Sequence, residues 1–514
     1  MKSNRFIFVK SCINLTGYVS IVTTIFGLEL EKTSNSSGQS GRESDFATYE
    51  ETQMKKFFYP TNLVVFGVAE SPLNLAKNIV FNCISMGFKG EIFPVGREGG
   101  VVYGKKIITN QEELPEGIDL AVILVPARFV ADVLQLCGRK GIHHAIISTG
   151  GFREFSHEET QLERDIVQTA DEFNIRFVGP NCIGIICTNS RLCTPFNPMK
   201  TASFKKGPVS LVVQSGGVTT QCAYNFSEEH LGFSKIISVG NKLNMVETDF
   251  LKYLMEDEDT EQIHMYLESI QDGRKLTRLV KRSPKPVVIF KSNVSKTASE
   301  IAFSHTAALS NDDRIVEGAL KQAGVTRVEN LNHMTVAARA LQLPPLHGNR
   351  LAVISMSGGF SVILGDACER YGFECPPLPD ELIHKIEQFR RAGVIRMSNP
   401  MDFGDVHDIK ALAFTLRNCL ALDNIDGLVL SFMYEPEMIR IFGEGIGTPK
   451  QTLGFIKKIC EEFKKPIALS FFAEKHHVEA FQRENTFPVF NDPVESIHAL
   501  SILGNYWRHN NRKT

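Results

Sequence analysis

Short apolar runs rich in β-branched residues alternate with amphipathic stretches from residue 62 to the end of the chain. This alternation is typical of parallel sheets covered by helices. The first series of apolar runs comprises 63–68, 91–96, 120–126, 144–149 and 175–180. We expect these five runs to form one doubly wound domain.

Two further series of apolar runs follow. The second comprises 208–217, 234–241, 263–269 and 286–293, and the third comprises 351–359, 426–432, 466–472 and 487–492. Proline-containing segments separate the three series, and a chain of 514 residues has room for about three cores at roughly 150 residues each. We therefore predict an α/β chain with domains at 53–200, 201–345 and 346–514.

The first 52 residues lack this pattern. Lys2, Arg5 and Lys10 precede an uncharged run, 11–28, that superficially matches a signal peptide but is diluted by polar residues. The same run makes a poor membrane-spanning helix, which needs about 20 mostly apolar residues. We expect residues 1–52 to be a disordered N-terminal extension.

The charges of the chain nearly cancel, with 56 Lys and Arg against 58 Asp and Glu. No bulk electrostatic field therefore favours nucleic acid, and no membrane partner is indicated. The eleven cysteines form no CxxC pair and lack zinc-ligand spacing, so no metal site is predicted. We interpret them as reduced thiols and expect a cytoplasmic protein.

Two segments place Ser-Gly-Gly directly after an apolar run, at 215–217 and 357–359. Such a turn exposes backbone amides at a helix N-terminus, where anions bind. Strand-to-helix turns also contain glycine for purely steric reasons. Either segment alone is therefore weak evidence of an anion site.

The turn after the first apolar run, 67–72, occupies the position of a phosphate-binding turn in a Rossmann-like domain. It lacks the GxGxxG pattern, and Arg97 follows the second run where a dehydrogenase has an acidic residue. Arg97 indicates a phosphate ligand, with a solvated surface arginine as the alternative.

Three motifs carry a resemblance to a known family: GPNCIG at 179–184, YLES at 266–269 and SHT at 304–306. With them the chain resembles the NDP-forming acyl-CoA synthetases, which include ADP-forming acetate–CoA ligase and the succinyl-CoA synthetase alpha chain. The resemblance implies a Rossmann-like CoA-binding domain followed by two flavodoxin-like domains.

The resemblance also implies roles for individual residues. His305 would be the transiently phosphorylated residue on a mobile loop, Glu268 would orient its ring, and Ser215, Gly216 and Gly217 would hold the phosphoryl oxygens. Asn181 and Cys182 would lie beside the acyl group. The implied CoA-binding residues are Gly67, Ala69, Ser71, Arg97, Val125 and Pro126.

This sequence departs from the family pattern at four positions. Ala307 and Ser310 replace glycines after the histidine, and Glu70 and Glu98 replace a serine and a lysine near the CoA turn. The sequence also shows no ATP-grasp module. The resemblance therefore implies a heteromer with a separate ATP-grasp beta subunit, which would bring ATP or ADP and Mg²⁺.

The predicted function is that of an alpha-type subunit that joins a small carboxylic acid to CoA while ATP becomes ADP and phosphate. One alternative is a non-catalytic CoA- or acyl-CoA-binding regulatory or scaffold subunit. A second is a nicotinamide-dependent dehydrogenase. The motifs leave the acyl group open.

Overall fold

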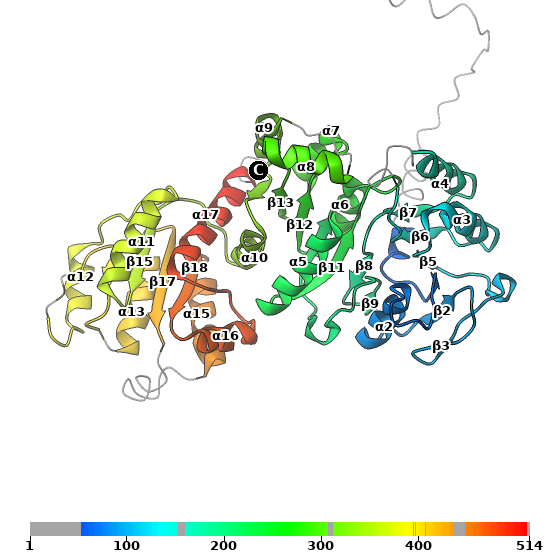
Figure 1. Ribbon diagram of the computed structural model, residues 1–514. Coiled ribbons are helices and arrows are strands. Elements are labelled where there is room, and N and C mark those ends of the chain that lie inside the picture. Colours follow the sequence, from blue (N-terminus) through cyan, green and yellow to red (C-terminus); the bar gives the residue numbers. More distant parts are fainter. Residues whose placement is uncertain are drawn as a thin grey trace, which may run out of the picture. The chain divides into compact units, whose positions relative to one another are not determined.

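The computed structural model describes residues 53–152, 160–306, 312–393, 395, 397–406, 408–434 and 448–510, without the side chains of 302–306. The predicted disorder of residues 1–52 lies outside the described residues. Three separate parallel sheets follow one another along the rest of the chain, each flanked by helices (Figure 1).

The first sheet has the order β2-β1-β5-β6-β7 and is wholly parallel. Its strands are β1 Asn62–Phe66, β2 Glu91–Val95, β5 Leu120–Ile123, β6 His144–Ile147 and β7 Arg176–Val178, with a hairpin of β3 Val101–Val102 and β4 Lys105–Lys106 beside it. The helices are α2 Ala76–Met86, α3 Val130–Arg139 and α4 Thr160–Glu172, with short 3₁₀ turns η1 Gln111–Glu113 and η2 Ala127–Phe129.

The second sheet has the order β14-β13-β12-β10-β11-β8-β9. Its strands are β8 Ile185–Cys187, β9 Leu192–Cys193, β10 Val209–Val213, β11 Phe233–Ser238, β12 Gln262–Leu267, β13 Val287–Lys291 and β14 Thr326–Val328. The helices are α5 Gly216–Glu228, α6 Glu247–Glu256, α7 Gly273–Arg282, α8 Lys296–Thr306, α9 Asp313–Ala323 and α10 Leu331–Ala340, with a 3₁₀ turn η4 Thr201–Ser203. Strands β8 and β9 are antiparallel additions, so the chain enters the second sheet before residue 200.

The third sheet has the order β16-β15-β17-β18-β19 and is wholly parallel. Its strands are β15 Leu351–Ser355, β16 Met401–Asp402, β17 Gly427–Met433, β18 Ile467–Phe472 and β19 Val489–Phe490. The helices are α11 Gly358–Arg370, α12 Asp380–Glu387, α13 Ile409–Leu420, α15 Pro449–Phe463, α16 Lys475–Glu484 and α17 Pro493–Asn510.

All three sheets repeat one strand order. Counting only parallel strands within each domain, the second strand lies on one side of the first, and the third, fourth and fifth follow on the other. The chain therefore reverses direction between the first and third strands, at β1/β5, β10/β12 and β15/β17. In open α/β sheets, ligands bind at this switch point, outside the carboxyl ends of the strands.

The apolar runs predicted from sequence form the central strands, which are buried on both faces as parallel strands require. The elements absent from the prediction are short or edge strands, namely β3, β4, β8, β9, β14 and β16. Two or three residues offer no periodicity to recognise. The doubly wound α/β class itself is confirmed.

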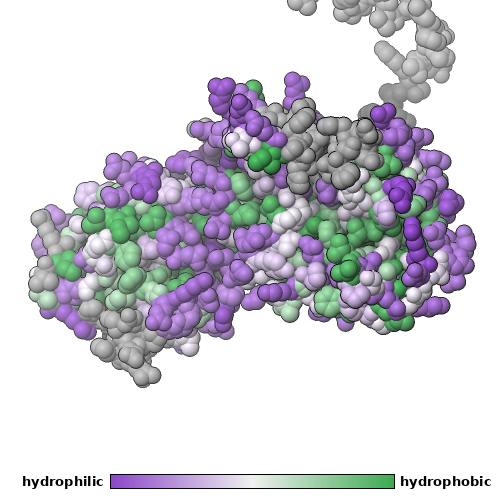
Figure 2. Space-filling model, viewed as in Figure 1, coloured by the Kyte–Doolittle hydropathy of each residue, from purple (hydrophilic) through white to green (hydrophobic). Residues whose placement is uncertain are grey.

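Hydrophilic residues are spread over the face drawn in Figure 2, with hydrophobic residues in patches between them. Among the described residues, no helix has the length and apolar character needed to cross a membrane. The ten described cysteines are free, and all but Cys375 are buried. The expected cytoplasmic location stays a prediction.

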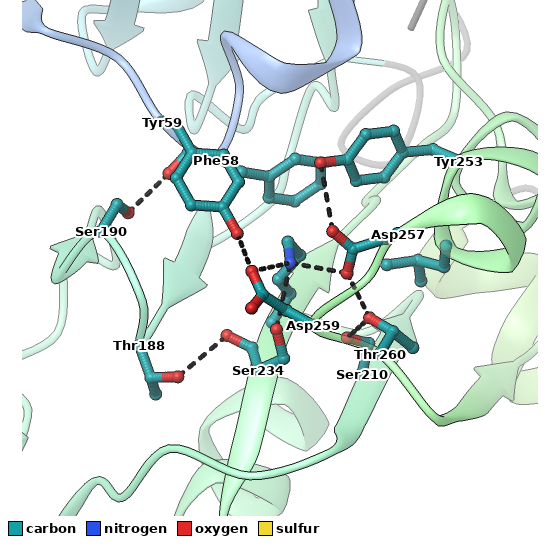
Figure 3. A network of polar contacts seen from close by, with 12 residues as sticks. Phe58, Tyr59, Thr188, Ser190, Ser210, Ser234, Tyr253, Asp257, Asp259 and Thr260 are labelled. Carbon is teal, nitrogen blue, oxygen red and sulfur yellow. Dashed lines mark hydrogen bonds and ion pairs between the residues drawn. The ribbon is translucent and has the colours of Figure 1, made fainter.

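A network of polar and aromatic contacts around a buried ion pair of the second domain joins the segment before β1 to that domain (Figure 3). Lys235 of β11 is fully buried, and its Nζ lies 2.7 Å from Oδ2 of Asp257. The same ammonium lies over the rings of Phe58 and Tyr59, and the Tyr59 hydroxyl donates to Asp259. Lys235 therefore fixes the start of the first domain on the second through charge and cation–π contacts.

Replacing Lys235 with Met should destabilise the chain by about 3–5 kcal/mol, because it leaves the Asp257 carboxylate buried without its cation. Urea denaturation of the full chain measures this free energy of unfolding. The matched control is Lys385→Met, which removes an exposed pair with Glu381 and should cost less than about 1 kcal/mol. Equal losses in the two variants would show that burial does not make the Lys235–Asp257 pair more stabilising than an exposed pair.

Candidate functional site

The turn after β1 is closed by a glycine at the first switch point. Gly67 has φ +93°, and a Cβ placed on it would lie 2.0 Å from the Leu124 carbonyl oxygen. The amides of Gly67 and Val68 both donate to the Val95 carbonyl, at 3.0 and 2.9 Å. The close approach therefore excludes a side chain at position 67, and the two hydrogen bonds hold the turn after β1 against the end of β2.

The structure brings the six predicted CoA-binding residues to one edge of the first sheet. Gly67, Ala69 and Ser71 follow β1, Arg97 follows β2, and Val125 and Pro126 follow β5. These three strands are neighbours in the order β2-β1-β5. The Val125 amide donates to Thr149 Oγ1 at 3.2 Å, which fixes the turn after β5.

Arg97 has a companion that sequence reasoning missed. The guanidinium carbons of Arg97 and Arg128 lie 5.1 and 4.8 Å from the centre of the Phe129 ring. Both arginines are exposed, and cation–π contact holds them at the same edge of the sheet. Two guanidinium groups in this place suit a phosphate-bearing ligand. The only sequence signal for Arg128 was its position directly after Val125-Pro126-Ala127.

Glu70, one of the departures from the family pattern, fastens the turn to the β3–β4 hairpin. Its Oε1 accepts the Val101 amide at 2.7 Å. Gly100 passes so close that an added Cβ would lie 2.4 Å from the Glu70 carboxyl carbon. The side chain is thus engaged with the protein's own backbone.

The GPNCIG segment bridges the first two sheets. Its Gly179–Pro180 bond is cis, and Asn181 has φ +55°. The Asn181 amide donates to the Thr149 carbonyl at 2.8 Å, while its side-chain amide donates to Asn241 Oδ1 at 3.3 Å. Cys182 is buried, and burial raises the pKa of its thiol to about 12. The thiol is therefore kept neutral and away from solvent.

The Ser-Gly-Gly turn begins α5, as its sequence predicts. Ser215 is the N-cap residue, and its Oγ accepts the Val218 amide at 3.5 Å. A Cβ on Gly216 would lie 2.6 Å from Ile183 Cγ2, so the start of α5 packs directly against the GPNCIG segment. The structure thus brings Ser215–Gly217 and the Asn181 segment together.

Glu268 lies at the carboxyl end of β12, the strand next to β10. Oε1 of Gln214 accepts the amides of Glu268 and Ser269, each at 3.0 Å, and Gln214 directly precedes Ser215. The Tyr266 hydroxyl donates to Glu268 Oε1 at 3.4 Å. The second switch point therefore places the Glu268 carboxylate near the N-terminus of α5, and Gln214 links the two segments.

Two buried lysines flank Glu268, and sequence reasoning missed both. Lys242 Nζ donates to the Ser269 carbonyl at 2.8 Å and lies 3.1 Å from Glu247 Oε2. Lys291 Nζ donates to the Glu268 carbonyl at 2.9 Å. Burial lowers the pKa of both lysines, that of Lys291 to about 8. A lysine ending an apolar strand, as Lys291 does, is the signal that could have identified it.

The segment that carries His305 is helical rather than a loop. Residues 296–306 form α8, whose first turn is capped by Ser295 Oγ accepting the Ala298 amide at 3.1 Å. The alanines of this segment favour a helix, so the expectation of a loop at 304–306 is wrong, while the expected mobility of the segment stays a prediction. His305 belongs to the last turn of α8, but its side chain is not among the described atoms. Ala307 and Ser310 lie outside the described residues altogether.

Family models match both of the first two domains. A CoA binding domain matches residues 61–188, and a succinyl-CoA ligase like flavodoxin domain matches residues 206–341.

The chain is also similar to a curated protein over most of its length. It is 30% identical over 461 residues to acetate–CoA ligase (ADP-forming) I subunit alpha of Pyrococcus furiosus, covering 88% of this chain and 97% of that protein. The chain belongs to the ADP-forming acetate–CoA ligase family. Another ligase of this family, acetate–CoA ligase (ADP-forming) I of Archaeoglobus fulgidus, is 30% identical, and the match covers 64% of its length.

Solved structures agree with this assignment. The dinucleotide forming acetyl-coenzyme A synthetase 1 of Ca. Korarchaeum cryptofilum, in complex with phosphate and ADP, has a TM-score of 0.78 and 26% identity. The match covers 89% of this chain and 97% of that one. The family, the fold class and membership of the acid–thiol ligases are thus confirmed. The comparisons do not favour a non-catalytic subunit. The domain boundaries and the roles of individual residues stay predictions.

Replacing Gly67 with Ala should weaken CoA binding at least tenfold, because the new methyl group collides with the Leu124 carbonyl and reshapes the turn. Isothermal titration of the full chain with CoA measures the Kd. Gly117→Ala is the matched control: it has φ +75° but no atom within 4 Å of the added Cβ. Unchanged CoA affinity in a folded Gly67→Ala variant would contradict the assignment of this turn.

Because of Lys291, the free energy of unfolding of the chain should rise with pH in the alkaline range. The folded pKa is about 8, whereas a free lysine titrates near about 10.4. Between these values the unfolded chain binds the proton that the folded chain has released, so stability rises with pH. The difference in free energy of unfolding between the wild type and Lys291→Met should rise by at most about 1.4 kcal/mol per pH unit from pH ~8 to ~10. Urea denaturation at several pH values tests this. Parallel curves for the two proteins would refute it.

Proposed function

We propose that this chain is the alpha-type subunit of an ADP-forming acyl-CoA synthetase that works through an acyl phosphate and a phosphohistidine. The overall reaction joins a carboxylic acid and CoA while ATP becomes ADP and phosphate. The observation that carries the proposal is the second switch point, where Ser215–Gly217, Glu268 and two buried lysines converge. Two relatives named as acetate–CoA ligase (ADP-forming) alpha subunits support it.

In the thioester-forming direction, His305 carries the phosphoryl group that ATP supplies and passes it to the acid carboxylate, giving an acyl phosphate and neutral histidine. The CoA thiol then attacks the acyl carbon, and inorganic phosphate leaves. Each step is reversible. CoA would lie along the carboxyl ends of β1, β2 and β5, with Arg97 and Arg128 at its phosphates.

The second switch point offers what phosphoryl transfer to an imidazole requires. Amides at the start of α5 would hold phosphoryl oxygens, since a helix N-terminus favours anions. Lys242 and Lys291 offset the negative charge that gathers there. Glu268 would accept a hydrogen bond from the other ring nitrogen of His305 and so fix the reactive tautomer.

The nucleotide step is assigned to a partner. The relatives named as an alpha subunit support the existence of a second subunit. We place ATP or ADP and Mg²⁺ on an ATP-grasp beta subunit of a heteromer.

The chain alone should become phosphorylated by labelled acetyl phosphate, because that step needs only His305 and the second switch point. The label should be labile in acid and stable in base. His305→Asn should abolish it, and Glu268→Gln should slow it about 10- to 100-fold. The control is Glu261→Gln, at the opposite, exposed end of β12.

Labelling of His305→Asn, or equal rates in Glu268→Gln and Glu261→Gln, would contradict the proposed chemistry. Absence of label from the wild-type chain, with CoA still bound, would instead favour the non-catalytic CoA-binding subunit. Thermal-shift titration separates the ligands: CoA should raise the Tm and NAD should not. Stabilisation by NAD alone would favour the dehydrogenase.

A further inference from the structure

The backbone of the turn after β12 is held by side chains from the ends of three other strands of the same sheet. After β10, Gln214 accepts the amides of Glu268 and Ser269 on its Oε1, each at 3.0 Å. From β13, Lys291 donates to the Glu268 carbonyl at 2.9 Å, and Lys242, after β11, donates to the Ser269 carbonyl at 2.8 Å. Both amides and both carbonyls of these two residues therefore have a side-chain partner.

Holding the turn in this way costs free energy. Gln214, Lys242 and Lys291 are only 6%, 2% and 4% exposed. Burial lowers the pKa of both lysines, because the charged ammonium loses its water. Glu247 is fully buried and offsets part of this cost, since its Oε2 lies 3.1 Å from Lys242 Nζ. Its Oε1 accepts the amide of Gln271, which extends the same support to the end of the turn.

The corresponding turn of the first domain is held with far less. It follows β5, which is the third parallel strand of its sheet as β12 is of the second. There the Leu124 amide donates to the Phe66 carbonyl at 3.2 Å. Thr149 Oγ1 accepts the Val125 amide at 3.2 Å and donates to the Val125 carbonyl at 2.8 Å. The repeated strand order does not by itself require the buried glutamine and lysines, which instead set apart the turn that carries Glu268.

The Glu268 side chain is directed by a further pair of hydroxyl groups. The Tyr266 hydroxyl donates to Glu268 Oε1 at 3.4 Å, and it accepts the Ser292 hydroxyl at 3.0 Å. The carboxylate itself is only partly buried, whereas the side chains that hold its backbone are buried. A carboxylate that orients a histidine must keep one direction, and groups behind it can fix that direction without touching the reacting atoms.

Gln214 connects the two parts of the site, because it directly precedes Ser215 and holds the amides of Glu268 and Ser269. We propose that Gln214 is a positioning residue that acts through Glu268. It fixes the backbone of the turn after β12, so that the carboxylate keeps the direction needed to accept the ring N–H of His305. This inference rests on the proposed function, in which His305 is phosphorylated and Glu268 orients its ring.

The test is a double-mutant cycle on the labelling of the full chain by acetyl phosphate. Gln214→Leu should lower the maximal labelling rate about tenfold, because the two amides lose their acceptor and the carboxylate loses its direction. The acetyl phosphate concentration that gives half of the maximal rate should not change. In a chain that already carries Glu268→Gln, the same replacement should change the rate by less than about twofold, because the residue through which it acts has been removed.

A milder variant keeps the test valid should Gln214→Leu fail to fold. Gln214 Nε2 donates to Ser269 Oγ at 3.1 Å, and Ser269→Ala removes this partner. Its loss of labelling rate should be smaller than that of Gln214→Leu. It should again be seen only in the chain that retains Glu268.

Gln262→Leu is the matched control. Gln262 is 3% exposed and its Nε2 donates to the Ala338 carbonyl at 3.2 Å, but it is the first residue of β12, at the opposite end of the strand. This variant should lower the free energy of unfolding in urea, because it leaves a buried carbonyl without its donor. It should keep the wild-type labelling rate.

An equal loss of rate with and without Glu268→Gln would overturn the proposal, since Gln214 would then act on the Ser215 turn instead. A wild-type rate in Gln214→Leu would overturn it as well. The two proposals fail in different ways. Equal losses in a chain that is labelled overturn only the positioning role, whereas absence of label from the wild-type chain overturns the proposed function and the positioning role together.

Discussion

The site geometry depends on the absence of a side chain at one position in each domain. Gly67, Gly216 and Gly358 each follow the first strand of their sheet, and an added Cβ would lie 2.0, 2.6 and 2.6 Å from a neighbouring atom. Each glycine lets its strand-to-helix turn pack closely against a neighbouring segment, namely the turn after β5, the GPNCIG segment and strand β16, respectively.

Charge distinguishes the three switch points that share this geometry. The first has two exposed arginines, both in cation–π contact with the ring of Phe129. The second has a carboxylate flanked by two buried lysines, whose pKa values burial lowers. The third has a cavity lined by the Asp402 carboxylate, and its described lining contains neither lysine nor arginine. The three switch points thus share one strand order but differ in the charges near the carboxyl ends of their strands.

The sequence was most informative where hydrophobic pattern or a motif decides the structure. The central strands were predictable because parallel strands buried on both faces must be continuous apolar runs. The residues around Gly67, Ser215 and Glu268 were predictable because their motifs match a family. Strand β16 was not predictable, since two residues are too few to show a hydrophobic periodicity. The residues at the end of α8 were expected to form a loop.

Contacts between distant segments were beyond sequence reasoning. Lys235 lies in a predicted strand, but its pairing with Asp257 depends on how β11 and the end of α6 meet, and its contact with Phe58 depends on how the first domain meets the second. Lys242 and Gln214 are ordinary residues in sequence. Only the fold shows that both hold the turn that carries Glu268.

Hydrogen–deuterium exchange of the full chain with and without CoA tests the switch-point account most directly. The account predicts slower exchange at the amides of residues 67–71, 95–97, 124 and 125, which follow or end three neighbouring strands, because a bound ligand suppresses local opening there. Protection confined to the amino ends of those strands, or to the third domain, would contradict it.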